Sequence, residues 1–366
     1  MTAGDQRQGR RWLLAWRVCR RLPEPLAFLV GRVGGRLFHR LDRRRREALR
    51  ANLARVLGPG VPPRALERVV RRGFVSYGRY WMEAFRLEDL DAAVLRGRLE
   101  VVEGRQHLDA AVAAGRGVIL AVPHVGNWDA GGAWVAASAE LLGATGHGRR
   151  RPALREDRPA PPDPPAGPLQ LIHQGTRAGF PGPLRVTAVA ERLEPPELFY
   201  RFVAYRRALG LEILPLEEGS ATTRALLRVL RDGGIVCLVC DRDLTGGGLE
   251  VDLFGAPARM PAGPAALALR TGAALLPAAV YHARRPMHWE GVVRPPLSPA
   301  TSGDQRADVQ ALTELLAGEL QGLIARAPEQ WHVLSDHWRP RRPPDPDGVP
   351  APQEPEGSGE PGTVPR

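Results

Sequence analysis

Short apolar runs separated by helical stretches make up the chain from about residue 100 onward. Residues of high strand propensity gather in the runs 117–122, 185–190, 211–216, 235–240 and 274–281. The segments 219–232 and 263–271, which lie between these runs, carry apolar residues at helical spacing. Alternation of strands and helices is typical of an α/β domain. We therefore predict an α/β core over residues 100–338.

The first 99 residues follow another pattern, in which arginines alternate with apolar residues at helical spacing. This pattern indicates amphipathic helices with a basic face, such as those that lie in the interface of an anionic membrane. Helices that pack on a core and turn solvated arginines outward give the same pattern. We predict an amino-terminal helical membrane-association region at 1–99. The apolar residues that carry this prediction include Trp12, Trp16, Leu22, Leu26, Phe28, Leu29, Val30, Leu37, Phe38 and Leu41.

Two segments lack periodicity. Residues 143–184 contain a run of three arginines followed by many prolines and glycines, which indicates a disordered Pro/Arg-rich insertion. Residues 339–366 are rich in proline, glycine and glutamate, which indicates a disordered tail.

The charge of the chain favours an anionic partner. The formal net charge is +11, and arginine carries all of the positive charge because no lysine is present. The run Arg43 to Arg46 is basic, but no nucleic-acid motif accompanies it, so we expect no nucleic-acid partner. We find neither a cleavable signal sequence nor an apolar run of membrane-spanning length, and we expect a peripheral protein that is not exported.

The three cysteines do not point to a special site. Three thiols cannot form a disulfide framework, which fits a reducing compartment. Cys237 and Cys240 have the spacing of a redox or metal pair, but both lie inside an apolar run, so we assign them to a buried strand. His332 and His337 lack a second cluster at ligand spacing, and we expect no metal.

Polar residues follow several of the predicted strands. His124 comes directly after the first strand, Glu191 after the second, and Asp241 after the fourth. The carboxyl edge of a sheet is where open α/β folds bind ligands. A histidine with a nearby carboxylate can take a proton from a hydroxyl near neutral pH, although buried histidines after strands are also often structural. Asp129 is the carboxylate nearest to His124 in the sequence.

The stretch His124-Val125-Gly126-Asn127-Trp128-Asp129 resembles the HX4D motif of glycerolipid acyltransferases. Asn127 and Trp128, which lie between the histidine and the aspartate, are similar to the motif residues of one branch of this family. That branch contains the lipid A late acyltransferases and the phosphatidylinositol mannoside acyltransferases. Further matches follow in order at 45–53, 80–83, 189–195, 205–206, 241–245, 254–255, 260–268, 271–274 and 328–332. The resemblance covers about residues 10–338 apart from 143–184, and it implies a single α/β catalytic domain whose mixed central sheet is flanked by helices.

The resemblance implies transfer of an acyl group, palmitoyl in our expectation, from acyl-CoA to a sugar hydroxyl of a glycolipid, and we expect a mannose hydroxyl of a phosphatidylinositol mannoside. The reaction is expected at the cytoplasmic face of the plasma membrane, without a cofactor. His124 matches the general base. Asp241 matches the carboxylate that orients it, which is often a glutamate in this branch, so the shorter side chain raises the question of reach. Asp129 is the other candidate partner, and the resemblance favours a role in supporting the motif turn.

The resemblance also implies substrate-binding residues. Glu191 and Arg206 match positions on the sugar-phosphate side, although the two could instead form a structural ion pair. Asn127 and Arg242 are further candidates, and Arg242 could equally fix the loop after the strand. Residues 263–280 are rich in small apolar residues and could line an acyl channel or belong to the core. We expect a monomer. Other glycolipid or lysophospholipid acceptors, and hydrolysis in place of transfer, remain open alternatives.

Overall fold

The computed structural model describes residues 16–139, 184–191, 196–216, 220–243, 246–298 and 302–338. The predicted insertion at 143–184 lies outside these residues except for Leu184, and the predicted tail at 339–366 lies outside them entirely. Both stay predictions, as does the division of the chain at residue 99.

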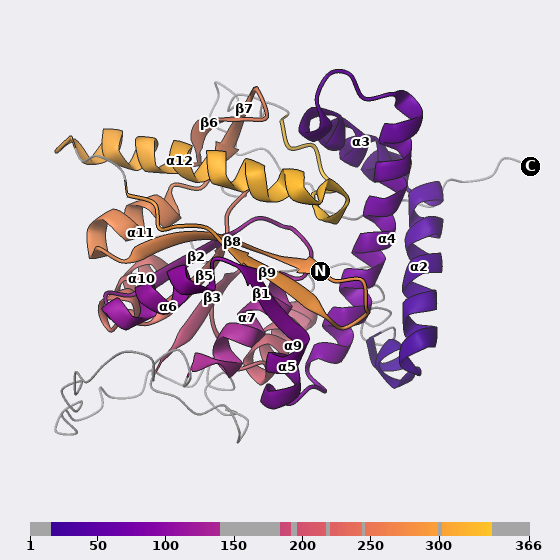
Figure 1. Ribbon diagram of the computed structural model, residues 1–366, viewed down its shortest axis with the longest axis horizontal. Helices are drawn as coiled ribbons and strands as arrows, with labels where there is room; N and C mark the ends of the chain where they lie inside the picture. The colour runs from indigo at the N-terminus through magenta and orange to yellow at the C-terminus, as the bar shows by residue number, and fades with distance from the viewer. Residues whose placement is uncertain are drawn as a thin grey trace, which may run out of the picture.

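Within the described residues, seven strands form a mixed central sheet (Figure 1). Their order is β1-β9-β8-β2-β5-β3-β4, and all neighbours are parallel except β8 and β9. This confirms the predicted fold class. The bounds are β1 (Leu99–Glu103), β2 (Val118–Val122), β3 (Val186–Ala190), β4 (Glu212–Pro215), β5 (Ile235–Val239), β8 (Ala274–His282) and β9 (Trp289–Val293).

Helices cover both faces of the sheet. Because successive strand residues point to opposite faces, Leu120 belongs to one apolar core and Ile119 to the other. The core around Leu120 receives side chains from α5 (Ala92–Arg98), α6 (Arg105–Ala114), α7 (Trp128–Ala137) and α9 (Pro196–Ala208). The core around Ile119 receives them from α10 (Ala221–Arg231), α11 (Gly263–Thr271) and α12 (Gln305–Arg326), and α12 crosses its face of the sheet (Figure 1). The short 3-10 helix η2 (Pro328–Gln330) follows α12.

The amino-terminal helices lie at one end of the sheet. They are α2 (Glu24–Leu41), α3 (Arg43–Leu57) and α4 (Pro63–Leu87), and α2 runs alongside α4 (Figure 1). The two backbones meet through glycines, since a Cβ at Gly31 would lie 2.9 Å from the carbonyl oxygen of Gly78. Glycine therefore permits a contact that any larger residue would prevent.

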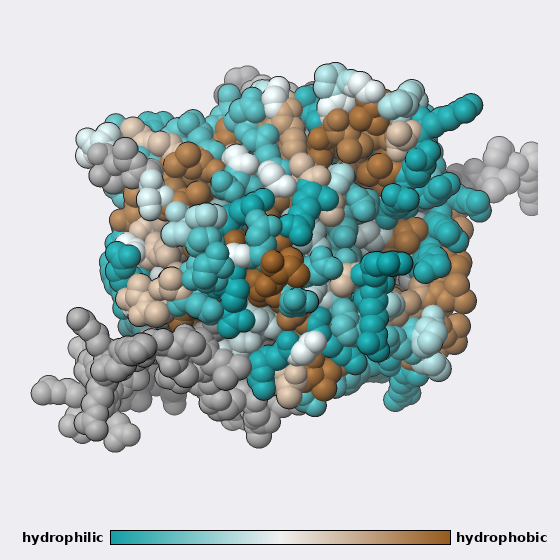
Figure 2. Space-filling model, in the orientation of Figure 1, coloured by the Kyte–Doolittle hydropathy of each residue, from teal (hydrophilic) through white to brown (hydrophobic). Residues whose placement is uncertain are grey.

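The face of α2 that points away from α4 is apolar and exposed. Figure 2 shows hydrophobic side chains gathered along the right-hand edge of the molecule, over α2. None of the helices in the described part of the chain combines the length and the apolar character of a membrane-spanning segment. The exposed residues of this face, which we call the α2 apolar face, are Leu26, Leu29, Val30, Val33, Leu37 and Leu41.

The sequence pattern missed four strands. β1 and β9 form one edge of the sheet, and each is short and carries a glutamate that weakens its apolar signal. β6 (Leu249–Leu253) and β7 (Ala256–Met260) pair only with each other as an antiparallel hairpin. Its alternate residues are exposed, which is why no continuous apolar run marks these strands.

Candidate active site

His124 and Asp241 lie side by side because β2 and β5 are neighbouring parallel strands. Val122 at the end of β2 is in register with Val239 at the end of β5, so the residues that follow the two strands lie at the same edge of the sheet. The Nδ1 atom of His124 lies 2.5 Å from Oδ1 of Asp241, and the backbone N–H of His124 donates to Oδ2 at 3.1 Å. Trp331 donates its indole N–H to the same Oδ2 at 2.7 Å. The aspartate is therefore long enough to reach the histidine.

The surroundings of this pair determine which ring nitrogen of His124 carries the proton. The Asp241 side chain is completely buried, whereas the His124 side chain is 22% exposed. Burial alone would raise the pKa of Asp241, but His124 and Trp331 outweigh burial and hold that pKa well below its usual value. An ionised Asp241 accepts the proton on Nδ1, so neutral His124 carries its free lone pair on Nε2. The Nε2 atom is thus available to accept a proton.

Asp129 has other partners than His124. Its carboxylate is buried and accepts hydrogen bonds from the Tyr80 hydroxyl at 2.8 Å and from Nε of Arg206 at 2.7 Å. Burial opposes the charge of Arg206, but Asp129 outweighs burial and raises the pKa of the guanidinium. Of the two carboxylates considered for orienting His124, the structure pairs it with Asp241. Arg206 forms an ion pair, and binding of an anionic head group by Arg206 stays a prediction.

Asn127 lies within the motif with its polar groups bound by the protein, and its role in substrate binding stays a prediction. Its side chain is fully buried, and Oδ1 accepts the N–H of Ala130 at 3.0 Å, so that Asn127 caps the amino terminus of α7. Its Nδ2 atom donates to Oε2 of Glu83 at 3.0 Å. Both polar groups of the carboxamide are held by the protein.

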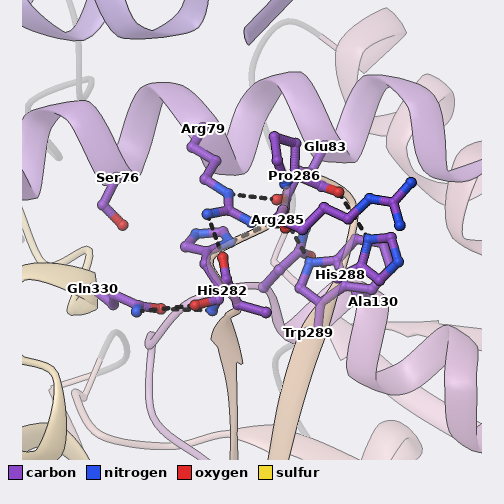
Figure 3. A network of polar contacts seen from close by, with 12 residues as sticks. Ser76, Arg79, Glu83, Ala130, His282, Arg285, Pro286, His288, Trp289 and Gln330 are labelled. Atoms are coloured by element: carbon purple, nitrogen blue, oxygen red, sulfur yellow. Dashed lines mark hydrogen bonds and ion pairs between the residues drawn. The ribbon is translucent and has the colours of Figure 1, made fainter. Parts of the chain in front are cut away.

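Glu83 is the centre of a buried polar network that the sequence did not reveal (Figure 3). Besides Asn127, its carboxylate contacts Nε of Arg79 at 2.7 Å, Nδ1 of His282 at 3.0 Å and the indole N–H of Trp289 at 2.6 Å. Burial favours the neutral acid, but His282, Arg79 and Asn127 together lower the pKa of Glu83 to about 2. The signals in the sequence were a glutamate among Met82, Ala84 and Phe85 and its place in the matched stretch 80–83, and neither of them indicated its partners.

Glu191 and Arg242 were also predicted to bind substrate. Glu191 is exposed at the end of β3, and Nη1 of Arg242 donates to the Ser335 hydroxyl at 2.9 Å. Their roles in substrate binding stay predictions. His332 lies 2.9 Å from the Ser76 hydroxyl, and its backbone N–H donates to the carbonyl of His124 at 2.8 Å. Within the described ranges, no cluster of His, Cys, Asp or Glu could hold a metal ion.

An apolar cavity of about 60 Å³ begins next to His124. Pro123, Val125 and Trp128 line it on the side of the motif, and it continues between α7 and the sheet past Gly131 and Val280. Of the predicted channel at 263–280, only residues 278–280 line this cavity, because α11 packs on the opposite face. A proton acceptor, its orienting carboxylate and an apolar cavity thus meet at one edge of the sheet.

This arrangement suits transfer of an apolar acyl group to a hydroxyl. A base at the hydroxyl and a cavity for the hydrocarbon are two of the features that such a reaction requires. The amino terminus of α7 supplies backbone N–H groups and the positive end of a helix dipole close to the motif.

Comparison with known proteins agrees with this chemistry. Residues 7–156 and 181–340 match the model of a family described as bacterial lipid A biosynthesis acyltransferase. The chain is 40% identical over 326 residues to a protein of Mycobacterium tuberculosis (strain CDC 1551 / Oshkosh) named phosphatidylinositol mannoside acyltransferase, covering 88% of this chain and 86% of that protein. A protein of the same name from Mycolicibacterium smegmatis is 38% identical over 325 residues, 88% of each chain.

Proposed function

Because the chain belongs to the bacterial lipid A biosynthesis acyltransferase family, we propose that it transfers an acyl group from acyl-CoA to a mannose hydroxyl of a phosphatidylinositol mannoside. That the protein is an acyltransferase acting on a glycolipid follows from its family and its relatives. The choice of acceptor is supported by the names of relatives that are 38–40% identical to this chain. The observation that carries the proposed mechanism is the His124–Asp241 pair beside an apolar cavity.

In the proposed reaction, Nε2 of His124 takes the proton from the mannose hydroxyl. The hydroxyl oxygen attacks the thioester carbonyl carbon, and a new C–O bond forms. When the C–S bond breaks, the CoA sulfur leaves with the electron pair and receives the proton from His124. Asp241 stabilises the imidazolium that exists between these two proton transfers.

The apolar cavity is the proposed site of the acyl chain. Pro123 and Val125, the sequence neighbours of His124, line this cavity, which supports a placement of the thioester near Nε2. An engineered cavity of roughly 150 Å³ holds one benzene molecule. The cavity of about 60 Å³ therefore accepts the first methylenes of a long chain, and the rest requires side chains between α7 and the sheet to move.

Peripheral binding to the cytoplasmic face of the plasma membrane is part of the proposal. The α2 apolar face offers adjacent leucine and valine side chains to a lipid interface. The α2 helix also carries Arg32, Arg36 and Arg40, and α3 begins with a run of four arginines, which suits anionic head groups. An enzyme held in this way meets glycolipid acceptors without extracting them from the bilayer.

The test is a reaction with acyl-CoA and a mixture of lipid acceptors, followed by mass spectrometry of the products. We expect acylated phosphatidylinositol mannoside from the wild-type protein and none above background from His124→Ala. If the main product were an acylated lipid A precursor or an acylated lysophospholipid, that lipid would be the acceptor in place of phosphatidylinositol mannoside. Free fatty acid without acylated lipid would indicate a hydrolase. Undiminished transfer by His124→Ala would refute the role of His124.

A further inference from the structure

We propose that Glu83 is a positioning residue of the active site, which holds the loop carrying His124 through Asn127. The proposal rests on the proposed role of His124 as the base. Glu83 does not contact the reacting atoms. It lies on α4, in the amino-terminal helical region (Figure 3), and the hydrogen bond that it accepts from Asn127 connects that region to the motif.

The carboxylate joins four separate elements at one buried point. Three donors converge on Oε2, namely Asn127 before α7, His282 at the end of β8 and Trp289 at the start of β9. The fourth, Arg79, belongs to α4 and approaches Oε1. Only a side chain with two acceptor oxygens and a negative charge satisfies four donors that include a guanidinium.

The loop between His124 and Asn127 has an anchor at each end. At one end, Asp241 holds the His124 ring and its backbone N–H. At the other end, the backbone N–H of Asn127 donates to the carbonyl of Val280 at 2.9 Å, and its side chain donates to Glu83. Gly126 lies between them at φ +58°, where a Cβ would collide with the carbonyl of Val280.

Through this geometry, the position of Glu83 affects the orientation of Nε2 of His124. The loop lies against β8, where the backbone of Gly126 packs directly on Val280, so we expect a shift of Asn127 to move the backbone of His124. A displacement of about 1 Å at reacting groups costs on the order of 100-fold in rate. Stability alone does not require the carboxylate, because apolar packing often replaces buried ion pairs without loss.

Two variants separate positioning from stability. Asn127→Ser keeps an N-cap oxygen for α7 but removes the donor to Glu83. Trp289→Phe is the matched control, because it removes another donor from the same Oε2 atom without touching the motif. We expect Asn127→Ser to lower kcat on the order of 10- to 100-fold with little change in KM. For Trp289→Phe we expect a lower Tm and a kcat within about twofold of the wild type.

A second readout does not depend on turnover. NMR of the protein labelled at histidine Cε1, with His124→Ala to assign the signal, gives the pKa of His124 in each variant. We expect Asn127→Ser and Glu83→Gln to shift this pKa, and Trp289→Phe to leave it unchanged. An unchanged His124 signal in Asn127→Ser, or an equal change in Trp289→Phe, would overturn the proposal. Absence of acyl transfer by the wild-type protein would instead reject the proposed function, while the NMR comparison still decides the role of Glu83.

Discussion

Asp241 holds His124 at two points, since one carboxylate oxygen accepts the ring Nδ1–H and the other accepts the backbone N–H of the same residue. The two contacts fix both the tautomer of the ring and the position of its backbone. Trp331 in turn holds the second oxygen, so the carboxylate cannot rotate without losing a buried hydrogen bond.

Replacing Asp241 tests whether this residue sets the tautomer of His124. In Asp241→Asn the amide can present a donor to Nδ1, which places the proton on Nε2 and removes the base. We expect kcat to fall by about 1,000-fold or more while the protein stays folded. Asp241→Glu keeps the charge and should retain far more activity. Steady-state kinetics with circular dichroism as a control for folding measure both, and equal losses in the two variants would contradict this reasoning.

Asp129 should matter more for stability than for chemistry. Asp129→Asn leaves the Arg206 guanidinium buried without its anionic partner, and we expect a loss of about 3–5 kcal/mol in the free energy of unfolding. Tyr80→Phe removes one hydrogen bond from the same carboxylate and should cost about 1 kcal/mol. Urea unfolding measures both losses. If Asp129→Asn were as stable as the wild type, the ion pair would have no structural role.

The width of the cavity can be changed at Gly131. A Cβ at Gly131 would lie 2.6 Å from Cγ2 of Val280, across the cavity that both residues line. We expect Gly131→Ala to lower kcat/KM about tenfold for palmitoyl-CoA and much less for butyryl-CoA. Adding Val280→Ala removes the atom that the new methyl group meets and should restore the long-chain reaction. Equal losses for both donors would place the acyl chain elsewhere.

The α2 apolar face should bind vesicles. Replacing Leu29 and Leu37, each 52% exposed, by glutamine removes apolar contact with a bilayer and should weaken binding to anionic vesicles more than about tenfold. Leu315→Gln on α12 is a suitable control, since Leu315 is also exposed, at 47%. Vesicle sedimentation measures the binding. Similar binding by the double variant and the wild type would assign membrane contact to another surface.

His337 should make the fold sensitive to acid. Burial, opposed by Asp241 and assisted by Arg242 and His124, lowers the pKa of His337 to about 4 from 6.5. Between these values the unfolded chain binds a proton that the folded protein does not, so stability falls as the pH drops from about 6.5 to 4. One such proton gives a slope of about 1.4 kcal/mol per pH unit. Urea unfolding of His337→Phe should show a smaller slope in this window.

Five strands of the central sheet were predictable because each lies in a continuous apolar run. β2, β3, β4, β5 and β8 all coincide with predicted runs, and α10 and α11 with predicted helices. The edge strand β1 and its neighbour β9 were not found, since charged and glycine residues interrupt their short patterns. β4 forms the other edge and was still found, because Ile213 and Leu214 lie in an apolar run, whereas the largely buried β9 was missed.

The two carboxylates near His124 show a second limit of the sequence. Proximity along the chain favours Asp129, and only the family resemblance indicated Asp241, which the neighbouring strands β2 and β5 bring across 117 residues to the ring. The contacts of Glu83 are even harder to predict, because its partners His282 and Trp289 are 199 and 206 residues away in the sequence. Such contacts follow from the sheet order, which local patterns do not encode.

Residues 330–332 hold the loop that carries His124, and they are synthesised long after that loop. Gln330 accepts the N–H of Gly126, Trp331 holds Asp241, and His332 binds the carbonyl of His124. These are among the last described residues of the chain, while the loop that they hold is made some 200 residues earlier. A nascent chain still on the ribosome therefore carries the histidine without its complete support, and the site is completed only after residues 330–332 have emerged.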